Sequence, residues 1–238
     1  MISAVIFDLD GTLVDSNDLH AEAWQETFRH FGKEIAYADL RRQIGKGGDK
    51  YLPEFLTARE MREIGPKVEA FRGKLFKRNY LSRVRPFAGV RELFEQLRSD
   101  GKRIALASSG VADEVKHYEK LLGIEELVDN RTTKDDVVHS KPASDVFVAA
   151  LKRLGDVPAD KAMAVGDTPY DAQAAKKLGL ATIAFRCGGF AEDELRAAGA
   201  IALFKDPADL LENYQRSPLA GAITGPHFRQ RDEPVQNE

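Results

Sequence analysis

Residues 4–12, AVIFDLDGT, decide how the rest of this 238-residue sequence is interpreted. The apolar run AVIF is typical of a short strand buried on both faces of a parallel sheet. Side chains alternate along a strand, so Asp8 and Asp10 point to one side while Leu9 points back into the core. Two neighbouring carboxylates repel each other unless a cation or a shared proton stabilises them. A plain Asp-Gly turn without a catalytic or binding role is the alternative. The position of the two acids at the end of a buried strand favours a functional role.

Short apolar runs alternate with longer amphipathic segments along the whole chain. Val90, Leu93, Phe94 and Leu97 have the i, i+3, i+4, i+7 spacing of one buried helix face. Strands that alternate with helices predict an α/β fold with a doubly wound, Rossmann-like parallel sheet. The further strand-like runs are RIALA (103–107), AMAV (162–165), ATIAF (181–185) and IALF (201–204).

One long stretch breaks this alternation. Residues 16–85 contain helical patterns and no strand-like run, which predicts an inserted all-α domain. The sheet domain then comprises residues 1–15 and 86–214. An insertion after the first strand lies over the carboxyl ends of the strands, where open α/β sheets bind ligands. Residues 215–238 are rich in Pro, Gly, Arg and Gln, and we expect this tail to be flexible rather than packed.

The composition excludes several classes of function. There are 35 Lys and Arg against 38 Asp and Glu, so the net charge of −3 gives no basic footprint for nucleic acid. No apolar run approaches the roughly 20 residues of a membrane-spanning helix, so we expect no membrane partner. The single cysteine, Cys187, excludes an intramolecular disulfide framework and a multi-cysteine metal site. It fits a reducing, cytoplasmic location.

Polar groups follow the later strands at the same predicted edge of the sheet. Taken singly, each is weak: Ser-Gly is a common turn, a lysine before proline is commonly exposed, and an acid can simply cap a helix. Together they supply hydroxyls, an ammonium and a second acidic pair, which suit a phosphate and a hard cation such as Mg²⁺. The residues concerned are Ser108, Ser109, Lys141, Asp167 and Asp171.

These four groups of residues, in this order, resemble the four motifs of the haloacid dehalogenase superfamily. The match spans residues 2–213, and the inserted helices resemble the small α-helical cap of that family. Within the superfamily, the chain is similar to the branch that holds phosphoglycolate-phosphatase-like and β-phosphoglucomutase-like enzymes.

The resemblance implies a role for each acid. Asp8 is the implied nucleophile, which would form an aspartyl-phosphate. Asp10 would protonate the leaving oxygen and then deprotonate the attacking water. Mg²⁺ would be held by the Asp8 carboxylate, the Asp10 main-chain carbonyl and Asp167, with Asp171 acting through water or as an orienting group.

The resemblance also implies a set of substrate-binding residues. Main-chain N–H groups of Gly11 and Thr12 would face the phosphate, and serine and lysine side chains would bind its oxygens. His20 stands near the cap hinge, and Lys46 lies in a glycine-rich stretch that could face an anionic substrate. An ordinary helix residue and a solvated turn lysine are the respective alternatives. With Ser109 and Lys46, which are proposed from their position in the sequence alone, the candidate substrate-binding residues are Gly11, Thr12, Ser108, Ser109, Lys141, His20 and Lys46.

The retained acids favour phosphoryl transfer over dehalogenation, because metal-free dehalogenases lack the acid at the position of Asp10. The mutase branch typically carries a second acid where this chain has Gly166, which favours a phosphatase. We therefore predict a Mg²⁺-dependent phosphatase that acts on a small phosphorylated metabolite, as a monomer or weak homodimer. A β-phosphoglucomutase-like mutase and a non-catalytic phospho-ligand sensor are the alternatives, and the sequence leaves the substrate open.

Overall fold

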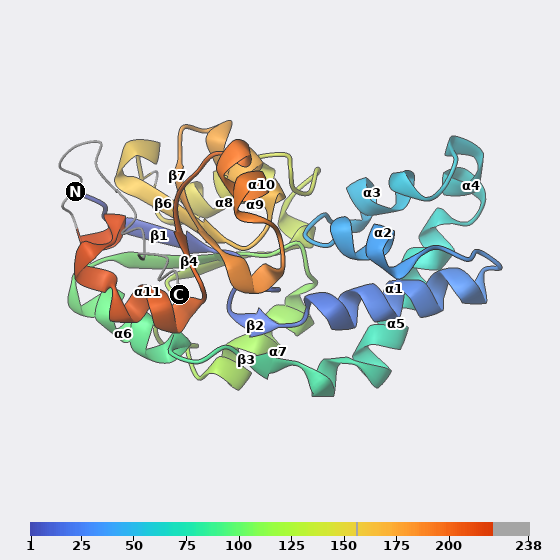
Figure 1. The fold of residues 1–238 in the computed structure, drawn as a ribbon, viewed down its shortest axis with the longest axis horizontal. Coiled ribbons are helices and arrows are strands. Elements are labelled where there is room, and N and C mark those ends of the chain that lie inside the picture. Colours follow the sequence, from blue (N-terminus) through green and yellow to red (C-terminus); the bar gives the residue numbers. More distant parts are fainter. Residues whose placement is uncertain (156, 221–238) are drawn as a thin grey trace, which may run out of the picture.

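The computed structural model describes residues 1–155 and 157–220, and within these ranges six parallel strands form the central sheet. The strand order is β5-β4-β1-β6-β7-β8, so β1 lies between β4 and β6 (Figure 1). The prediction of a parallel α/β fold is confirmed. The strands are β1 (Ala4–Phe7), β4 (Arg103–Ala107), β5 (Asn130–Thr132), β6 (Ala162–Gly166), β7 (Ala181–Phe185) and β8 (Ala200–Phe204).

The position of β1 explains where ligands can bind. The chain passes from β1 to β4 and β5 on one side and then returns to β6 on the other side. Parallel sheets open a crevice at such a reversal, just beyond the carboxyl ends of the strands. Asp8 and Asp10 follow β1 directly, so they stand at this crevice.

Helices cover both faces of the sheet (Figure 1). Side chains alternate along β1, so Val5 and Phe7 pack into one apolar cluster while Ala4 and Ile6 pack into another. The first face is covered by α6 (Val90–Ser99), α7 (Ala112–Leu122) and α11 (Pro207–Glu212), and the second by α8 (Asp145–Arg153), α9 (Pro169–Lys176) and α10 (Glu192–Ala198).

Residues 16–84, here called the helical segment, leave the sheet as an extension at one end of the molecule (Figure 1). They have their own apolar cluster, in which the Trp24 and Tyr51 rings stack with centroids 4.6 Å apart and Phe28 is fully buried. The helices are α1 (Asn17–His30), α2 (Tyr37–Arg42), α3 (Gly48–Tyr51), α4 (Ala58–Glu63) and α5 (Gly65–Asn79).

The two connections to the helical segment run side by side. Strands β2 (Val14–Asp15) and β3 (Arg85–Pro86) form an antiparallel pair, with Val14 opposite Pro86. Two residues per strand are too few for a periodic pattern, so the sequence did not predict this pair. Short 3₁₀ turns join other elements at Leu52–Glu54, Leu81–Arg83, Lys134–Asp136, Ala159–Lys161 and Arg186–Gly188.

The expectation of an unpacked tail is wrong for its first residues. Two 3₁₀ turns, Tyr214–Arg216 and Pro218–Ala220, follow α11, and Leu219 is fully buried in the same cluster as Val5. Burial of Leu219, together with Tyr214 in the same cluster, helps to hold this stretch against the sheet domain. The remainder of the predicted tail, residues 221–238, lies outside the described residues. None of the described helices is both long and apolar enough to cross a membrane.

Candidate active site

Three buried carboxylates meet at the edge of the sheet. Asp8 follows β1, Asp167 follows β6, and Asp171 lies in the first turn of α9. One oxygen from each side chain lies within 4.8 Å of the others. Carboxylate oxygens at such spacing are the ligands that hard divalent cations prefer. The structure thus brings together the acids that the sequence motifs singled out.

Lys141 provides the positive charge next to this cluster. Its buried ammonium contacts the Asp8 carboxylate and lies 2.8 Å from Asp171 Oδ1. Three carboxylates against one ammonium leave an excess of negative charge. Burial, together with the neighbouring acids Asp171 and Asp167, raises the pKa of Asp8 well above its ordinary value although Lys141 opposes the shift. Burial and Asp171 likewise raise the pKa of Asp167 to about 7.

Hydrogen bonds hold both oxygens of Asp167. Thr12 Oγ1 donates to Asp167 Oδ1 at 2.7 Å, and Asn17 Nδ2 donates to Oδ2 at 2.7 Å. These bonds fix the carboxylate and partly counteract the effect of burial on its pKa. Sequence reasoning missed Asn17, because its role depends on where the first turn of α1 lies.

Two glycines allow the chain to approach Asp167 closely. A Cβ atom on Gly188 would lie 2.0 Å from Asp167 Oδ2, and one on Gly11 would lie 2.3 Å from the same oxygen. Gly11 also has φ = +78°, which other residues rarely adopt. Neither position tolerates a side chain unless the acid moves.

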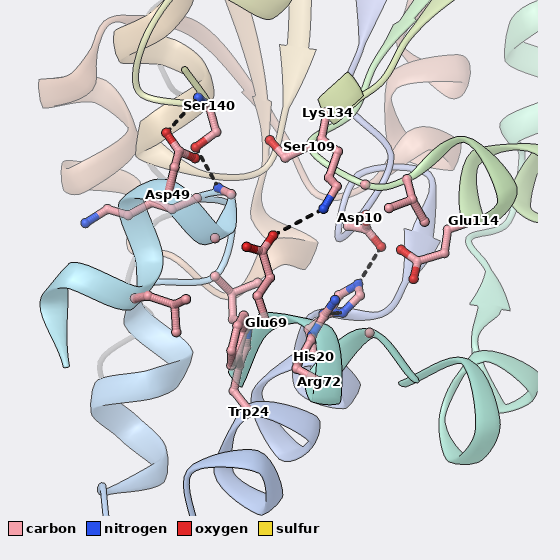
Figure 2. A pocket seen from close by; sticks show the side chains of 18 of the residues that line it. Asp10, His20, Trp24, Asp49, Glu69, Arg72, Ser109, Glu114, Lys134 and Ser140 are labelled. Atoms are coloured by element: carbon pink, nitrogen blue, oxygen red, sulfur yellow. Dashed lines mark hydrogen bonds and ion pairs between the residues drawn. The ribbon is translucent and has the colours of Figure 1, made fainter. Parts of the chain in front are cut away.

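Asp10 is held by residues of the helical segment. His20 Nε2 and Ser16 Oγ both lie 2.7 Å from Asp10 Oδ1 (Figure 2). The Arg72 guanidinium contacts His20 Nδ1, so Nδ1 is the acceptor and Nε2 carries the proton that points at Asp10. Burial alone would raise the pKa of Asp10, but His20 and Ser16 outweigh it and lower the pKa to about 2.

The main-chain part of the predicted phosphate site requires a correction. The Gly11 N–H donates to the Val14 carbonyl at 2.8 Å, and the Thr12 N–H donates to the Leu9 carbonyl at 3.1 Å. The tight turn therefore uses both N–H groups that we expected to face the phosphate. Across the described residues, the N–H groups of Leu9 and Asp10 donate no hydrogen bond, so these two are free to bind phosphate oxygens.

The two serines after β4 have different positions. Ser108 is buried, and its Oγ accepts a hydrogen bond from the Gly110 N–H at 2.9 Å. Its hydroxyl proton has no acceptor within the described part of the chain, so it can donate to a ligand. Ser109 lines the cavity described next.

A cavity of about 930 Å³ lies between the sheet edge and the helical segment, and its walls include Asp8, Asp10 and His20 (Figure 2). Lys46 also lines it, but its ammonium is 2.7 Å from Glu54 Oε1 and lies over the Tyr170 ring. This lysine is therefore neither solvated nor free for an anionic substrate, because the helical segment supplies its own counter-charge.

Polar contacts bridge the sheet edge and the helical segment around the cavity. The Gly47 N–H donates to Ser140 Oγ at 3.0 Å, and the Ser140 N–H donates to Asp49 Oδ2 at 3.2 Å. Lys134 Nζ lies 3.2 Å from Glu69 Oε1 (Figure 2). These pairs join residues about 65 to 93 positions apart in the sequence, so no local motif could reveal them.

Known proteins resemble this chain over most of its length. A sequence model described as "Haloacid dehalogenase-like hydrolase" matches residues 5–185. A phosphorylated carbohydrates phosphatase of Thermotoga maritima is 30% identical over 214 residues, covering 88% of this chain and 97% of that protein. A phosphoglycolate phosphatase of Aquifex aeolicus is 32% identical over 179 residues, covering 75% and 82%. The crystal structure of a hydrolase from Pseudomonas syringae superposes with a TM-score of 0.81 at 30% identity, covering 90% and 98%.

These relatives are hydrolases and phosphatases, and the buried acids at the sheet edge suit the same chemistry. The chain is thus an enzyme of the phosphatase type, a hydrolase of phosphoric monoesters. It belongs to the haloacid dehalogenase-like hydrolase family.

Proposed function

We propose that this enzyme is a Mg²⁺-dependent phosphatase that hydrolyses a small phosphorylated metabolite through an aspartyl-phosphate on Asp8. The proposal rests on the surroundings of Asp8. This buried carboxylate contacts the buried Lys141, lies near two further acids and lines the cavity. The curated relatives named above act on phosphorylated carbohydrates and on phosphoglycolate, which supports a small phosphate ester as substrate.

The residues present fit a divalent cation. Asp8, Asp167 and Asp171 would hold it with side-chain oxygens, and the Asp10 main-chain carbonyl accepts no hydrogen bond from any described residue. This carbonyl is therefore free to be a further ligand. When bound, Mg²⁺ would offset the excess negative charge and keep Asp8 and Asp167 ionised at neutral pH.

In the first step, Asp8 attacks the phosphorus atom. A bond forms between an Asp8 oxygen and phosphorus, the bond to the leaving oxygen breaks, and the leaving oxygen takes the proton of Asp10. The Lys141 ammonium, the Ser108 hydroxyl and the free N–H groups of Leu9 and Asp10 bind the phosphoryl oxygens. They stabilise the negative charge that develops there.

In the second step, water replaces Asp8 on phosphorus. Asp10, now a carboxylate, takes a proton from the water, and the bond between Asp8 and phosphorus breaks to release inorganic phosphate. The pKa of about 2 keeps Asp10 ionised at neutral pH, which is the form that can accept this proton. For the first step, the negatively charged phosphate ester raises the pKa of the neighbouring carboxyl, so that Asp10 holds its proton while the substrate is bound.

The structure disfavours the mutase alternative at one position. A Cβ atom on Gly166 would lie 2.5 Å from Asp171 Cγ, so the second acid of the mutase pattern does not fit here unless Asp171 moves. The non-catalytic sensor is disfavoured because Asp8 and Asp10 are both present and both line the cavity.

The remaining expectations also stand as proposals. We propose that residues 1–15 with 86–214 and residues 16–85 are two domains that open and close around the substrate. We further propose a cytoplasmic enzyme that acts as a monomer or weak homodimer, for which the free thiol of Cys187 suits a reducing compartment. Sedimentation analysis across a range of protein concentrations tests the oligomeric state.

The decisive experiment measures release of inorganic phosphate from p-nitrophenyl phosphate and a panel of phosphorylated metabolites. We expect release with Mg²⁺ and none after chelation by EDTA, with recovery when Mg²⁺ is added back. A second readout is thermal unfolding, since Mg²⁺ that binds the folded state raises the melting temperature.

The variant Asp167→Asn should lose both the release and the Mg²⁺-dependent rise in melting temperature. Replacement of an exposed acid, Asp160→Asn, is the matched control and should keep both. Release that is indifferent to EDTA contradicts the proposal. So does a faster interconversion of sugar phosphates, primed by a sugar bisphosphate, than release of phosphate.

A further inference from the structure

Glu114, the third residue of α7, is a buried acid that the proposed mechanism does not use. Its side chain lines the cavity together with Asp10 and Ser109, and Figure 2 shows its carboxylate turned into the cavity. The residue is only 7% exposed. Within residues 1–155 and 157–220, its carboxylate makes no hydrogen bond and no ion pair.

Helix capping does not explain this glutamate. Acids at the same third position of α4, α9 and α10 accept hydrogen bonds from the N–H of the residue that caps the helix, at 2.8, 3.1 and 3.3 Å. The carboxylate of Glu114 makes no such bond to Val111. The side chain is mostly buried while its unpaired carboxylate opens onto the cavity, so a ligand bound there is the polar partner that it can meet.

The surroundings place Glu114 on the side of the leaving group. Its Oε2 atom lies 3.4 Å from where a Cβ of Gly110 would be, directly after the Ser108–Ser109 loop. Burial raises the pKa of the Tyr118 hydroxyl, and the charges of Asp10 and Glu114 raise it further. Both carboxylates therefore lie near one buried hydroxyl. Asp10 must reach the oxygen that joins phosphorus to the leaving group. Glu114 lies near Asp10 in the same cavity and therefore faces the remainder of the leaving group.

Among the described residues, no basic side chain that lines the cavity forms an ion pair with Glu114. Lys46 is paired with Glu54, Lys77 with Asp113 and Lys134 with Glu69, and Lys74 also lines the cavity without an ion pair to Glu114. Arg72 contacts His20 and stacks on the rings of Trp24 and Phe76 at 5.2 and 4.8 Å. A hydroxyl on the leaving group can donate to a free carboxylate and accept from a guanidinium. A carboxylate on the leaving group would instead face a like charge at short range.

We propose that Glu114 is a specificity-determining residue that accepts a hydrogen bond from a hydroxyl of the leaving group. It selects uncharged, hydroxylated phosphate esters, such as sugar or polyol monophosphates, against phosphorylated acids. This inference rests on the proposed phosphatase function and narrows its substrate class.

The test uses three two-carbon phosphate esters that differ only at the far end. These are 2-hydroxyethyl phosphate, phosphoglycolate and 2-aminoethyl phosphate, which carry a hydroxyl, a carboxylate and an ammonium. In the unaltered enzyme with Mg²⁺, we expect kcat/KM for the hydroxyl compound to exceed that for phosphoglycolate by about tenfold or more. Equal values, or a preference for phosphoglycolate, overturn the inference without any variant. The ammonium compound as the best substrate overturns the assignment to neutral polyols.

Glu114→Gln keeps the shape of the side chain and removes its charge. We expect the ratio between the hydroxyl compound and phosphoglycolate to fall by about tenfold, mainly through faster turnover of phosphoglycolate. The matched control is Glu125→Gln, which makes the same substitution at an exposed residue outside the cavity lining. Its ratio should stay unchanged.

The ratio does not depend on how much of the variant is active, and thermal unfolding checks that it folds. An unchanged ratio in folded Glu114→Gln contradicts the inference while leaving the phosphatase intact. Failure of the unaltered enzyme to release phosphate from all three esters and from p-nitrophenyl phosphate refutes the proposed function itself, and this inference with it.

Discussion

Two groups of charges around the cavity are held in opposite ways. At the sheet edge, Asp8, Lys141 and Asp171 are almost entirely buried, and the Lys141 ammonium contacts both acids. The pair of Lys134 and Glu69, which bridges the sheet edge and the helical segment, has both side chains 43% exposed. Buried charges depend strongly on their partners, whereas exposed pairs contribute little. The geometry of the sheet edge therefore depends on its charge pairs, whereas the exposed bridge to the helical segment contributes little to stability.

The largest expected effect comes from removing the nucleophile. Asp8→Asn should lower phosphate release by at least about 10⁴-fold, because an amide does not attack phosphorus. It should not lower the melting temperature in the absence of Mg²⁺, since it removes one of three mutually repelling acids. The exposed neighbour Asp15→Asn should retain activity. Activity of Asp8→Asn within tenfold of the unaltered enzyme would exclude Asp8 as the nucleophile.

The contribution of Asp10 should appear as a loss of stability in acid. Its pKa of about 2 in the folded state lies below the ordinary value of 3.8, so the unfolded chain binds more protons between these values. The stability is thus fully present above about pH 4 and is lost as the pH falls through 2. It amounts to about 2 kcal/mol.

Denaturant unfolding of the enzyme and of Asp10→Asn between pH 5 and 2 measures this difference. The advantage of the unaltered protein should shrink by most of that amount over this range. A difference that stays constant with pH would show that His20 and Ser16 do not hold the carboxylate in its charged form.

The smallest effect is expected for the exposed pair of Lys134 and Glu69. A double-mutant cycle with Glu69→Gln and Lys134→Met should give a coupling free energy of unfolding of about 0.5 kcal/mol, reduced by salt. Arg59 and Glu63, a more exposed pair within α4 at 2.7 Å, provide the reference for an ordinary surface pair. A coupling free energy above about 2 kcal/mol would contradict the contrast, because the exposed pair would then contribute as much as a buried one.

The parts that the sequence predicted share one property. Asp8, Lys141 and Asp167 follow apolar runs or adjoin helix starts, and parallel strands carry such positions to one edge of the sheet. A local pattern was enough to place them together. Where that pattern was missing, the strand was not predicted. The edge strand β5 has the sequence Asn-Arg-Thr and contains no apolar run.

The parts that could not be predicted depend on packing between distant segments. Asn17 and Ser16 matter only because α1 begins beside the sheet edge, and Glu114 matters only because α7 turns one face to the cavity. The pairing of Lys46 with Glu54 likewise follows from the turn before α3. For the N–H groups of Gly11 and Thr12, the error was local, since a tight turn uses its own donors first.

The pairing of β2 with β3 has a consequence for how such enzymes can diversify. The chain enters the helical segment from β2 and leaves it into β3, and these two strands are paired. Because the two ends of the insertion are adjacent, an insertion of another length or fold can replace it at little cost in loop-closure entropy. The order of the strands in the sheet stays the same. Such an exchange changes more than the residues that face the substrate. Ser16, Asn17 and His20 follow β2 and so belong to the exchanged part. A new insertion also replaces the residues that hydrogen-bond to Asp10 and Asp167. The substrate selectivity of the enzyme and the pKa values of these two acids therefore change together.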